Sequence, residues 1–129
     1  MTLKVVVADD HKLFRQGLIG LMRAHDDMVE VVGEAASGQE AIQLAHQLRP
    51  DVILMDIQMP EMDGITATQE IFKLYAGRTR PYIFAMTAYA MKGDREKLLQ
   101  AGMDDYISKP VRLESLTAAL KNYIYQKKS

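Results

Sequence analysis

Apolar positions along the chain fall into two alternating patterns, short continuous runs and longer segments with helical spacing. The continuous runs, several of them rich in β-branched residues, predict five buried strands, at residues 3–8, 28–36, 52–55, 82–86 and 106–108. The periodic segments repeat apolar residues every three or four positions and predict five helices, at residues 12–25, 37–49, 64–74, 94–101 and 113–125.

Local signals mark several of the helix ends. Ser37 and Glu40 form a Ser-x-x-Glu capping box at the start of the second helix, and Pro50 ends that helix. Gly102 stands directly after the fourth helix, where glycine favours a helix C-terminus. No linker, repeat or low-complexity stretch interrupts this alternation. We therefore expect residues 1–129 to form one domain.

Strict alternation of strands and helices predicts an α/β fold of the (βα)5 type. Such a chain forms a parallel five-stranded sheet with helices on both faces. Right-handed crossovers make the sheet doubly wound, and we expect the flavodoxin-like strand order 2-1-3-4-5. In sheets of this kind ligands bind beyond the carboxyl ends of the strands, at the switch point of the topology. Functional residues are therefore expected directly after the strands.

Composition narrows the class of function. The chain has 129 residues, a net charge of −1 and no cysteine. The balanced charge disfavours direct nucleic-acid binding, and the lack of cysteine excludes disulfides, thiolate catalysis and thiolate zinc sites. No apolar run approaches the ~20 residues of a membrane span, and the N-terminus lacks a signal-peptide pattern. The cytoplasm is the expected location, with no membrane partner.

Polar residues of complementary chemistry follow four of the predicted strands. Asp9 and Asp10 follow the first strand, Asp56 the third, Thr87 the fourth and Lys109 the fifth. The order 2-1-3-4-5 would bring the three carboxylates together, and such a cluster repels itself unless a cation neutralises it. Hard oxygen ligands suit Mg²⁺, and a metal-held carboxylate facing a lysine and a hydroxyl is able to accept a phosphoryl group.

Taken singly, each of these residues has an ordinary explanation. An aspartate after a strand is most often a helix cap or turn residue, and a lone lysine is usually a solvated surface residue. The combination of all of them, each at the correct strand end, strongly favours the functional interpretation.

The same positions lie in longer segments that resemble the receiver domains of two-component response regulators. The segments are VVVADDH (Val5–His11), VILMDIQMPEMDG (Val52–Gly64), MTA (Met86–Ala88) and AGMDDYISKP (Ala101–Pro110). The resemblance covers essentially the whole chain. An acid pair or a Lys-Pro dipeptide alone would be unspecific, whereas the four segments together are highly specific.

The resemblance implies a phosphoacceptor and a metal site. It implies that Asp56 is the phosphoacceptor and that Asp10, Asp56 and the backbone carbonyl of Gln58 bind Mg²⁺, or Mn²⁺, directly. Asp9 would contact the metal through water. His11 is expected to be a helix-start residue, because three oxygen ligands already fill the site.

The resemblance also implies a coupled switch. Lys109 would bind the phosphoryl group, and Thr87 would move toward it. The space vacated beside the small Ala88 would let Tyr106 swing inward. The family further suggests a cis peptide bond between Lys109 and Pro110.

The implied function is phosphoryl acceptance without turnover, apart from slow self-dephosphorylation. The donor would be a phosphohistidine of a histidine kinase or a histidine phosphotransfer domain. The surface built by the fourth helix, fifth strand and fifth helix would then control an output partner, or a self-dimer formed through that surface. Tyr89, Met91 and Lys92 are expected on this surface, and Tyr89 is also expected to shield the phosphoryl group from water.

Three alternatives remain at this point. An aspartate-nucleophile phosphatase usually carries a second aspartate two residues after the nucleophile, where this chain has Gln58. A flavodoxin-like cofactor binder would need a Ser/Thr/Gly-rich phosphate loop where this chain has Asp9 and Asp10. A pseudo-receiver would normally have a degraded acidic site.

The output remains open as well. Residues 8–18 resemble receivers of helix-turn-helix transcription regulators, whereas residues 85–96 resemble receivers of hybrid histidine kinases.

Overall fold

The computed structural model describes residues 2–24, 28–76, 79–88, 92–109 and 111–128. Within these residues strands and helices alternate along the chain as predicted. The elements are β1 (Leu3–Ala8), α1 (Lys12–Arg23), β2 (Val29–Ala35), α2 (Gly38–Leu48), β3 (Val52–Asp56), α3 (Gly64–Leu74), β4 (Tyr82–Thr87), α4 (Lys92–Gln100), β5 (Asp105–Ser108) and α5 (Leu113–Lys128). The predicted positions of Tyr89, Met91 and Pro110 lie outside the described residues.

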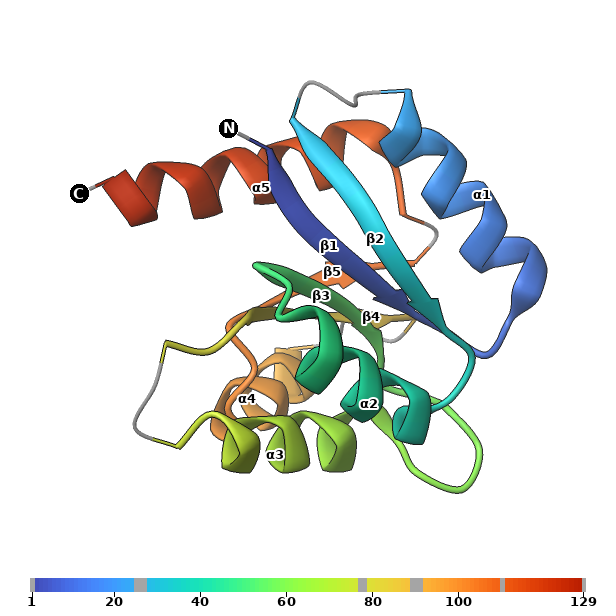
Figure 1. Cartoon of the computed structure of the whole chain (residues 1–129), viewed down its shortest axis with the longest axis vertical. Coiled ribbons are helices and arrows are strands. Elements are labelled where there is room, and N and C mark those ends of the chain that lie inside the picture. Colours follow the sequence, from blue (N-terminus) through green and yellow to red (C-terminus); the bar gives the residue numbers. More distant parts are fainter. Residues whose placement is uncertain (1, 25–27, 77–78, 89–91, 110, 129) are drawn as a thin grey trace.

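The strands form one parallel sheet in the order β2-β1-β3-β4-β5. This confirms the predicted (βα)5 fold and its flavodoxin-like strand order. The chain first moves from β1 outward to the edge strand β2 and then crosses back past β1 to β3, so its direction across the sheet reverses between β1 and β3 (Figure 1). That reversal is the switch point at which ligands bind in sheets of this class.

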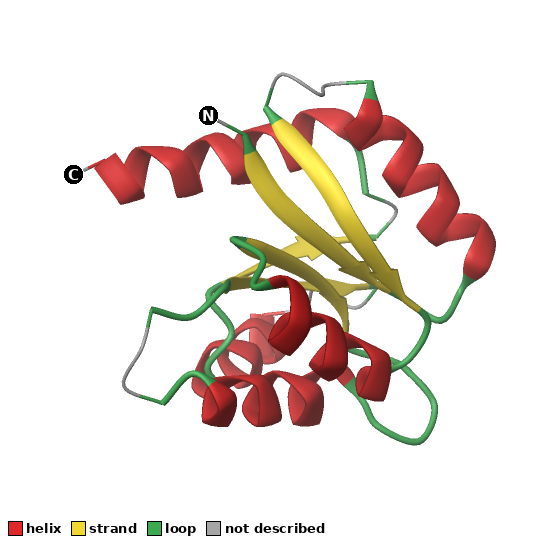
Figure 2. Cartoon of the chain, viewed as in Figure 1, coloured by secondary structure: helices red, strands yellow, loops and turns green. Residues whose placement is uncertain are grey.

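Helices cover both faces of the sheet, α1 and α5 one face and α2, α3 and α4 the other (Figure 2). The side chains of each strand alternate between two buried clusters, as the period of two along a strand requires. Val5 and Val7 pack with the α1 and α5 side, whereas Val6 and Ala8 pack with the α2 and α3 side. The continuous apolar runs in the sequence reflect this burial on both faces.

Several element ends differ from the sequence prediction by one or two residues. β3 extends to Asp56 and β4 to Thr87, because the parallel ladder pairs Asp56 with Met86 and Thr87 with Ser108. α4 begins at Lys92 instead of residue 94. Two of the candidate site residues are therefore the last residues of paired strands, where the ladder fixes their backbone.

The helix caps explain why two loops end where they do. Ser37 accepts a hydrogen bond from the backbone N–H of Glu40 at 3.2 Å, which confirms the capping interaction at the start of α2. Asp63 caps α3 in the same way, accepting from the N–H of Thr66 at 2.7 Å. After α2 the chain turns at Arg49, whose φ of 47° is left-handed, and Pro50 then prevents the helix from continuing.

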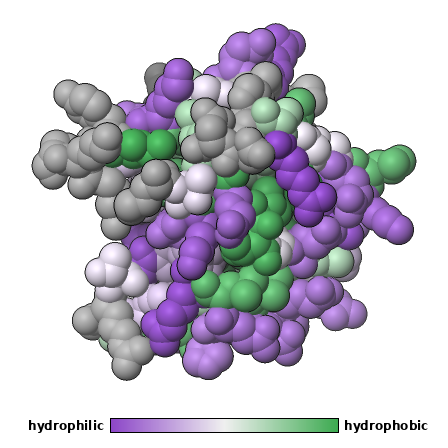
Figure 3. Space-filling model, turned by 45° about the horizontal axis from the view of Figure 1, so that its top comes forward, coloured by the Kyte–Doolittle hydropathy of each residue, from purple (hydrophilic) through white to green (hydrophobic). Residues whose placement is uncertain are grey.

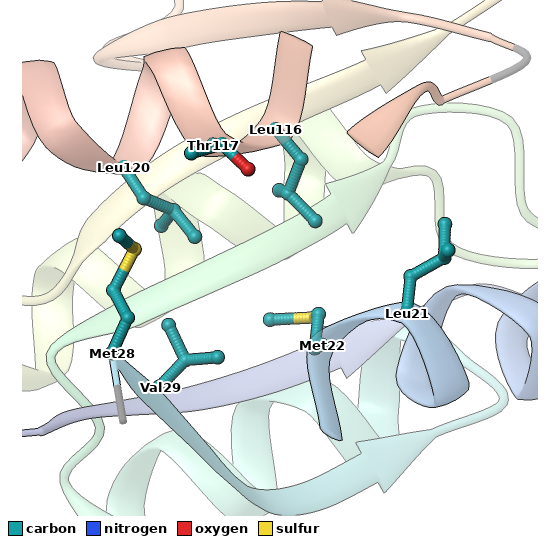
Figure 4. Close-up of a pocket in the computed structure, with 7 residues that line it drawn as sticks. All are labelled: Leu21, Met22, Met28, Val29, Leu116, Thr117 and Leu120. Atoms are coloured by element: carbon teal, nitrogen blue, oxygen red, sulfur yellow. The ribbon is translucent and has the colours of Figure 1, made fainter. Parts of the chain in front are cut away.

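A line of apolar side chains runs between α1 and α5. A small cavity of about 30 Å³ lies among residues of α1, α5 and the start of β2. Figure 4 shows the side chains that line it. Its lining comprises Leu21, Met22, Met28, Val29, Leu116, Thr117 and Leu120. An open groove of about 260 Å³ shares Leu21 and is otherwise lined by Leu13, Phe14, Gly17, Leu18 and Val111. Figure 3, in which the upper part of Figure 1 is turned toward the viewer, shows apolar side chains gathered in a strip between polar ones.

None of the described helices combines the length and apolar character that a membrane crossing requires.

Candidate functional site

The carboxyl ends of β1, β3 and β4 lie next to one another at one edge of the sheet. The register pairs Ala8 of β1 with Met55 of β3, so the residues that follow, Asp9 and Asp56, are at the same level. Thr87 ends β4, the strand on the other side of β3. The topology thus brings together three residues that are far apart in the sequence, as the sequence predicts.

Asp9 is fully buried, and both of its carboxylate oxygens have partners. Oδ1 accepts a hydrogen bond from the backbone N–H of His11 at 2.8 Å, and Oδ2 is 2.9 Å from the ammonium of Lys109. Burying a carboxylate is costly unless it is paired and hydrogen-bonded, and here both conditions are met.

Asp56 is 3% exposed and lies beside the same ammonium. Its Oδ1 is 3.3 Å from the Lys109 ammonium and accepts a hydrogen bond from the N–H of Gln58 at 3.1 Å. Burial raises the pKa of the Asp56 carboxyl, and the charge of Asp9 raises it further, while Gln58 and Lys109 act in the opposite direction. The ionised carboxylate of Asp56 is therefore not fully compensated by the protein alone, which favours a cation nearby.

Lys109 follows β5 and reaches back across the edge of the sheet. Its backbone N–H donates to the carbonyl of Thr87 at 2.8 Å, which extends the pairing of β4 and β5 by one step. Its ammonium bridges Asp9 and Asp56 and also lies 4.5 Å from the centre of the Phe14 ring. The side chain is 18% exposed, so the charge is placed at the boundary between the buried acids and solvent.

Asp9, Asp56 and Lys109 form the centre of the candidate site. The predicted switch residues lie on the β4 and β5 side of this centre. Thr87 is buried at the end of β4, and Ala88, directly after it, is exposed. Tyr106 is half-buried, pairs with Ala85 in the sheet and packs against the core on the side of α2 and α3. Their places in the fold are compatible with the predicted coupling, which remains a prediction.

The residues around Asp9 offer the donors that a hard cation requires. Asp9, Asp10 and His11 each place a potential ligand atom so that all three lie within 4.8 Å of one another. The side chain of Asp10 is exposed, and His11 is at the N-cap of α1 without a side-chain capping bond, as expected for a helix-start residue. Carboxylate oxygens next to a buried, incompletely compensated Asp56 fit Mg²⁺, which binds through a few carboxylates and keeps several waters.

Sequence reasoning missed Arg15, which supports Asp9 from α1. Its guanidinium donates to the backbone carbonyl of Asp9 at 2.7 Å and to the carboxylate of Glu34 at 2.8 Å. The hydrogen bond from Arg15 lowers the pKa of Glu34. A signal was present, because Arg15 stands four residues before Ile19 and seven before Met22, on the buried face of α1. An arginine on an apolar stripe indicates a buried partner.

Gly64, the first residue of α3, approaches the end of β3 very closely. A Cβ at this position would lie 2.3 Å from the carbonyl oxygen of Asp56 and 2.8 Å from the Cα of Ile57. The N–H of Gly64 donates to the carbonyl of Ile57 at 3.2 Å. The absence of a side chain thus lets the start of α3 pack onto the backbone that carries Asp56.

Comparison with known proteins agrees with this geometry. The family model described as the response regulator receiver domain matches residues 5–121. The histidine-protein kinase BarA of Shigella flexneri is 45% identical over 123 residues, which make up 95% of this chain and 13% of BarA. The response regulator VraR of Staphylococcus aureus is 41% identical over 123 residues, which make up 94% of this chain and 56% of VraR. The chain thus spans only part of the length of these relatives.

Two solved structures are similar over nearly all of this chain. The receiver domain of the sensor histidine kinase PA1611 from Pseudomonas aeruginosa, which has a magnesium ion coordinated in its active-site cleft, is 35% identical, with a TM-score of 0.82 over 96% of this chain and 98% of that chain. The receiver domain of Ssk1 from Saccharomyces cerevisiae, solved with the histidine phosphotransfer protein Ypd1, is 26% identical, with a TM-score of 0.83 over 93% of this chain and 87% of that chain. The chain belongs to the response regulator receiver family and is a receiver domain of two-component signalling.

Proposed function

We propose that this receiver accepts a phosphoryl group on Asp56 from a phosphohistidine, in a reaction that requires Mg²⁺. The observation that carries the proposal is the position of the Lys109 ammonium, 2.9 Å from Asp9 and 3.3 Å from Asp56 at the carboxyl edge of the sheet. A cation held between two buried carboxylates is placed to neutralise a phosphoryl group that arrives on one of them.

In the transfer, an oxygen of Asp56 attacks the phosphorus of the phosphohistidine. The O–P bond forms, the P–N bond breaks, and its electron pair returns to the imidazole of the donor. The phosphoryl oxygens then lie next to the Lys109 ammonium, and the hydroxyl of Thr87 donates a hydrogen bond to one of them. The protein contributes mainly alignment and charge compensation, as in other phosphoryl transfers.

Asp10, Asp56 and the backbone carbonyl of Gln58 would hold the Mg²⁺ ion, and Asp9 would reach it through water. When bound, the ion compensates the negative charge of the phosphoryl oxygens. The exposed side chain of Asp10 and the buried one of Asp9 fit this division, because the outer acid is accessible to the ion while the inner one is already paired with Lys109.

Phosphorylation would be read out on the surface of α4, β5 and α5. Thr87 moves toward the phosphoryl group, and Tyr106 turns inward next to Ala88, which changes the surface seen by a partner. The donor is a histidine kinase or a histidine phosphotransfer domain, and the complex of Ssk1 with Ypd1 supports a donor of the second kind. The output partner is a further domain, another protein or a second copy of the receiver.

The test is incubation with Mg²⁺ and acetyl phosphate, followed by intact-mass measurement and a phosphate-release assay. A gain of one phosphoryl group per chain that persists after the donor is removed is the expected result. Continuous release of phosphate would indicate a phosphatase instead. An unchanged mass would indicate a pseudo-receiver, and either of these outcomes would overturn the proposal.

Replacing Asp10 is expected to remove most of the stabilisation of the folded protein by Mg²⁺. For the wild type, a metal concentration of one hundred times its Kd adds about 2.7 kcal/mol to the free energy of unfolding. In Asp10→Ala most of this gain should be lost, because a direct ligand is missing. The measurement is the Tm with and without Mg²⁺.

The matched control is Glu30→Ala, which removes an exposed acid near the opposite end of the sheet. This variant should keep the full Tm shift with Mg²⁺. An undiminished shift in Asp10→Ala would place the metal elsewhere.

A further inference from the structure

Phe14 is the one described aromatic side chain in cation–π contact with Lys109. The ammonium of Lys109 lies 4.5 Å from the centre of the Phe14 ring. This is within the ~6 Å at which an aromatic face attracts a cation. The ring comes from the first turn of α1, whereas the lysine follows β5, so the contact links distant parts of the chain.

We infer that Phe14 is a positioning residue, which holds the Lys109 ammonium in place for the phosphoryl group on Asp56. The inference rests on the proposed function, because it assigns a task to Lys109 in phosphoryl acceptance. It adds a residue to the site that acts through the lysine and does not touch the reacting atoms.

The chemistry of the ammonium explains why an aromatic ring suits this position. An ammonium has three N–H donors, and Asp9 and Asp56 account for two directions of hydrogen bonding. The ring attracts the charge from a third side. Another carboxylate there would neutralise the ammonium, whereas the ring does not. The positive charge therefore remains available for the phosphoryl oxygens.

The surroundings of the ring support a role beyond packing. Phe14 is half-buried, packs against the core on the α1 and α5 side, and also lines the open groove with Leu13 and Val111. Its ring therefore lies beside the ammonium and also borders the groove. It keeps water from one side of Lys109, whose side chain is only 18% exposed. A cation–π contact gains strength when water is excluded in this way.

During phosphoryl transfer the ammonium has to redirect a hydrogen bond from a carboxylate oxygen to a phosphoryl oxygen. A lysine that loses one partner before gaining the next would be free to turn into solvent, at the cost of alignment. The ring limits this freedom throughout the exchange, since its attraction for the ammonium is independent of the direction of the N–H bonds.

The test compares Phe14→Leu, which retains apolar bulk but lacks an aromatic face, with Phe14→Tyr, which retains the face. The rate of phosphoryl uptake from acetyl phosphate at fixed Mg²⁺ should fall about three- to tenfold in Phe14→Leu. Phe14→Tyr should stay close to the wild type. Leu13→Ala is the matched control, because Leu13 is 89% exposed in the same groove and its rate should be unchanged.

A spectroscopic readout tests the contact in the wild type without any variant. A methylene group next to the ammonium and over the ring face should show proton NMR signals shifted upfield by the ring current. In Phe14→Leu that shift should disappear, and in Phe14→Tyr it should remain.

The outcomes separate this inference from the proposed function. Equal uptake rates for the wild type and Phe14→Leu would overturn the positioning role, as would unshifted Lys109 signals in the wild type. Equal losses in Phe14→Leu and Phe14→Tyr would indicate simple packing and overturn it too. A wild-type protein that takes up no phosphoryl group would instead overturn the proposed function, whatever the NMR signals show.

Discussion

Asp56→Asn is expected to take up no phosphoryl group from acetyl phosphate in the presence of Mg²⁺. The amide has the shape of the carboxylate but not its nucleophilic oxygen, so the fold should persist while the acceptor is lost. Intact-mass measurement should show the wild-type gain of one phosphoryl group and none in the variant. Asp51→Asn is the control, since Asp51 is exposed and precedes β3 at the opposite end of the same strand. Undiminished uptake by Asp56→Asn would refute the site.

The same substitution should raise stability at neutral pH in metal-free buffer. Burial raises the pKa of Asp56 in the folded state above its ordinary value, which the unfolded chain retains. At pH values between the unfolded-state pKa and the folded-state pKa, the folded protein therefore binds more protons than the unfolded chain. The free energy of unfolding of the wild type therefore falls as pH rises through this window. The amide does not ionise, and Asp56→Asn should lack this fall. Urea unfolding of both proteins across the acidic pH range tests the difference.

Gly64→Ala is expected to lower the free energy of unfolding by about 3 kcal/mol or more, at the upper end of overpacking effects. The new Cβ would lie 2.3 Å from the carbonyl oxygen of Asp56 and 2.8 Å from the Cα of Ile57. Both are backbone atoms of the β3 end and cannot turn away as a flexible side chain would. Urea unfolding of the wild type and the variant measures the loss.

Gly20→Ala is the matched control, because a Cβ at Gly20 meets no other atom within 4 Å. Within the helix α1, alanine replaces glycine with a gain of up to about 1 kcal/mol. The change in the free energy of unfolding is thus expected to be negative for Gly64→Ala and positive for Gly20→Ala, although both replace glycine by alanine. A loss in Gly64→Ala no larger than about 1 kcal/mol would mean that the start of α3 is able to shift away from β3.

The topology and most of the candidate site were predictable from the sequence, because residues that end parallel strands lie at the same edge of the sheet. Parallel strands bring their carboxyl ends to one edge, so Asp9 and Asp56 on the neighbouring strands β1 and β3 had to lie close together, and Lys109 was placed at the same edge. The same reasoning placed Thr87 at the end of β4. Each of these predictions used only the position of a residue along its strand.

The contacts that α1 makes with the centre were not predictable in this way. Phe14 lies in the segment that the sequence predicts as a helix, residues 12–25, but helical periodicity does not show that its ring meets Lys109. The bond from Arg15 to the carbonyl of Asp9 depends on the rotation of α1 about its own axis and on its distance from the sheet. Strand order does not fix those quantities, which arise from the packing of Leu18 and Ile19 into the core.

The first turn of α1 connects the centre to the local stability of the helix. It carries the ring beside Lys109 and the arginine on the Asp9 carbonyl, and it follows directly on the N-cap His11, whose N–H binds the Asp9 carboxylate. Fraying at this helix end would remove these three contacts together and leave Asp9 and Lys109 held by their ion pair and by Asp56. If phosphoryl acceptance proceeds as proposed, we expect opening of this turn to lower the fraction of molecules competent for the transfer, and amide hydrogen exchange would measure that opening.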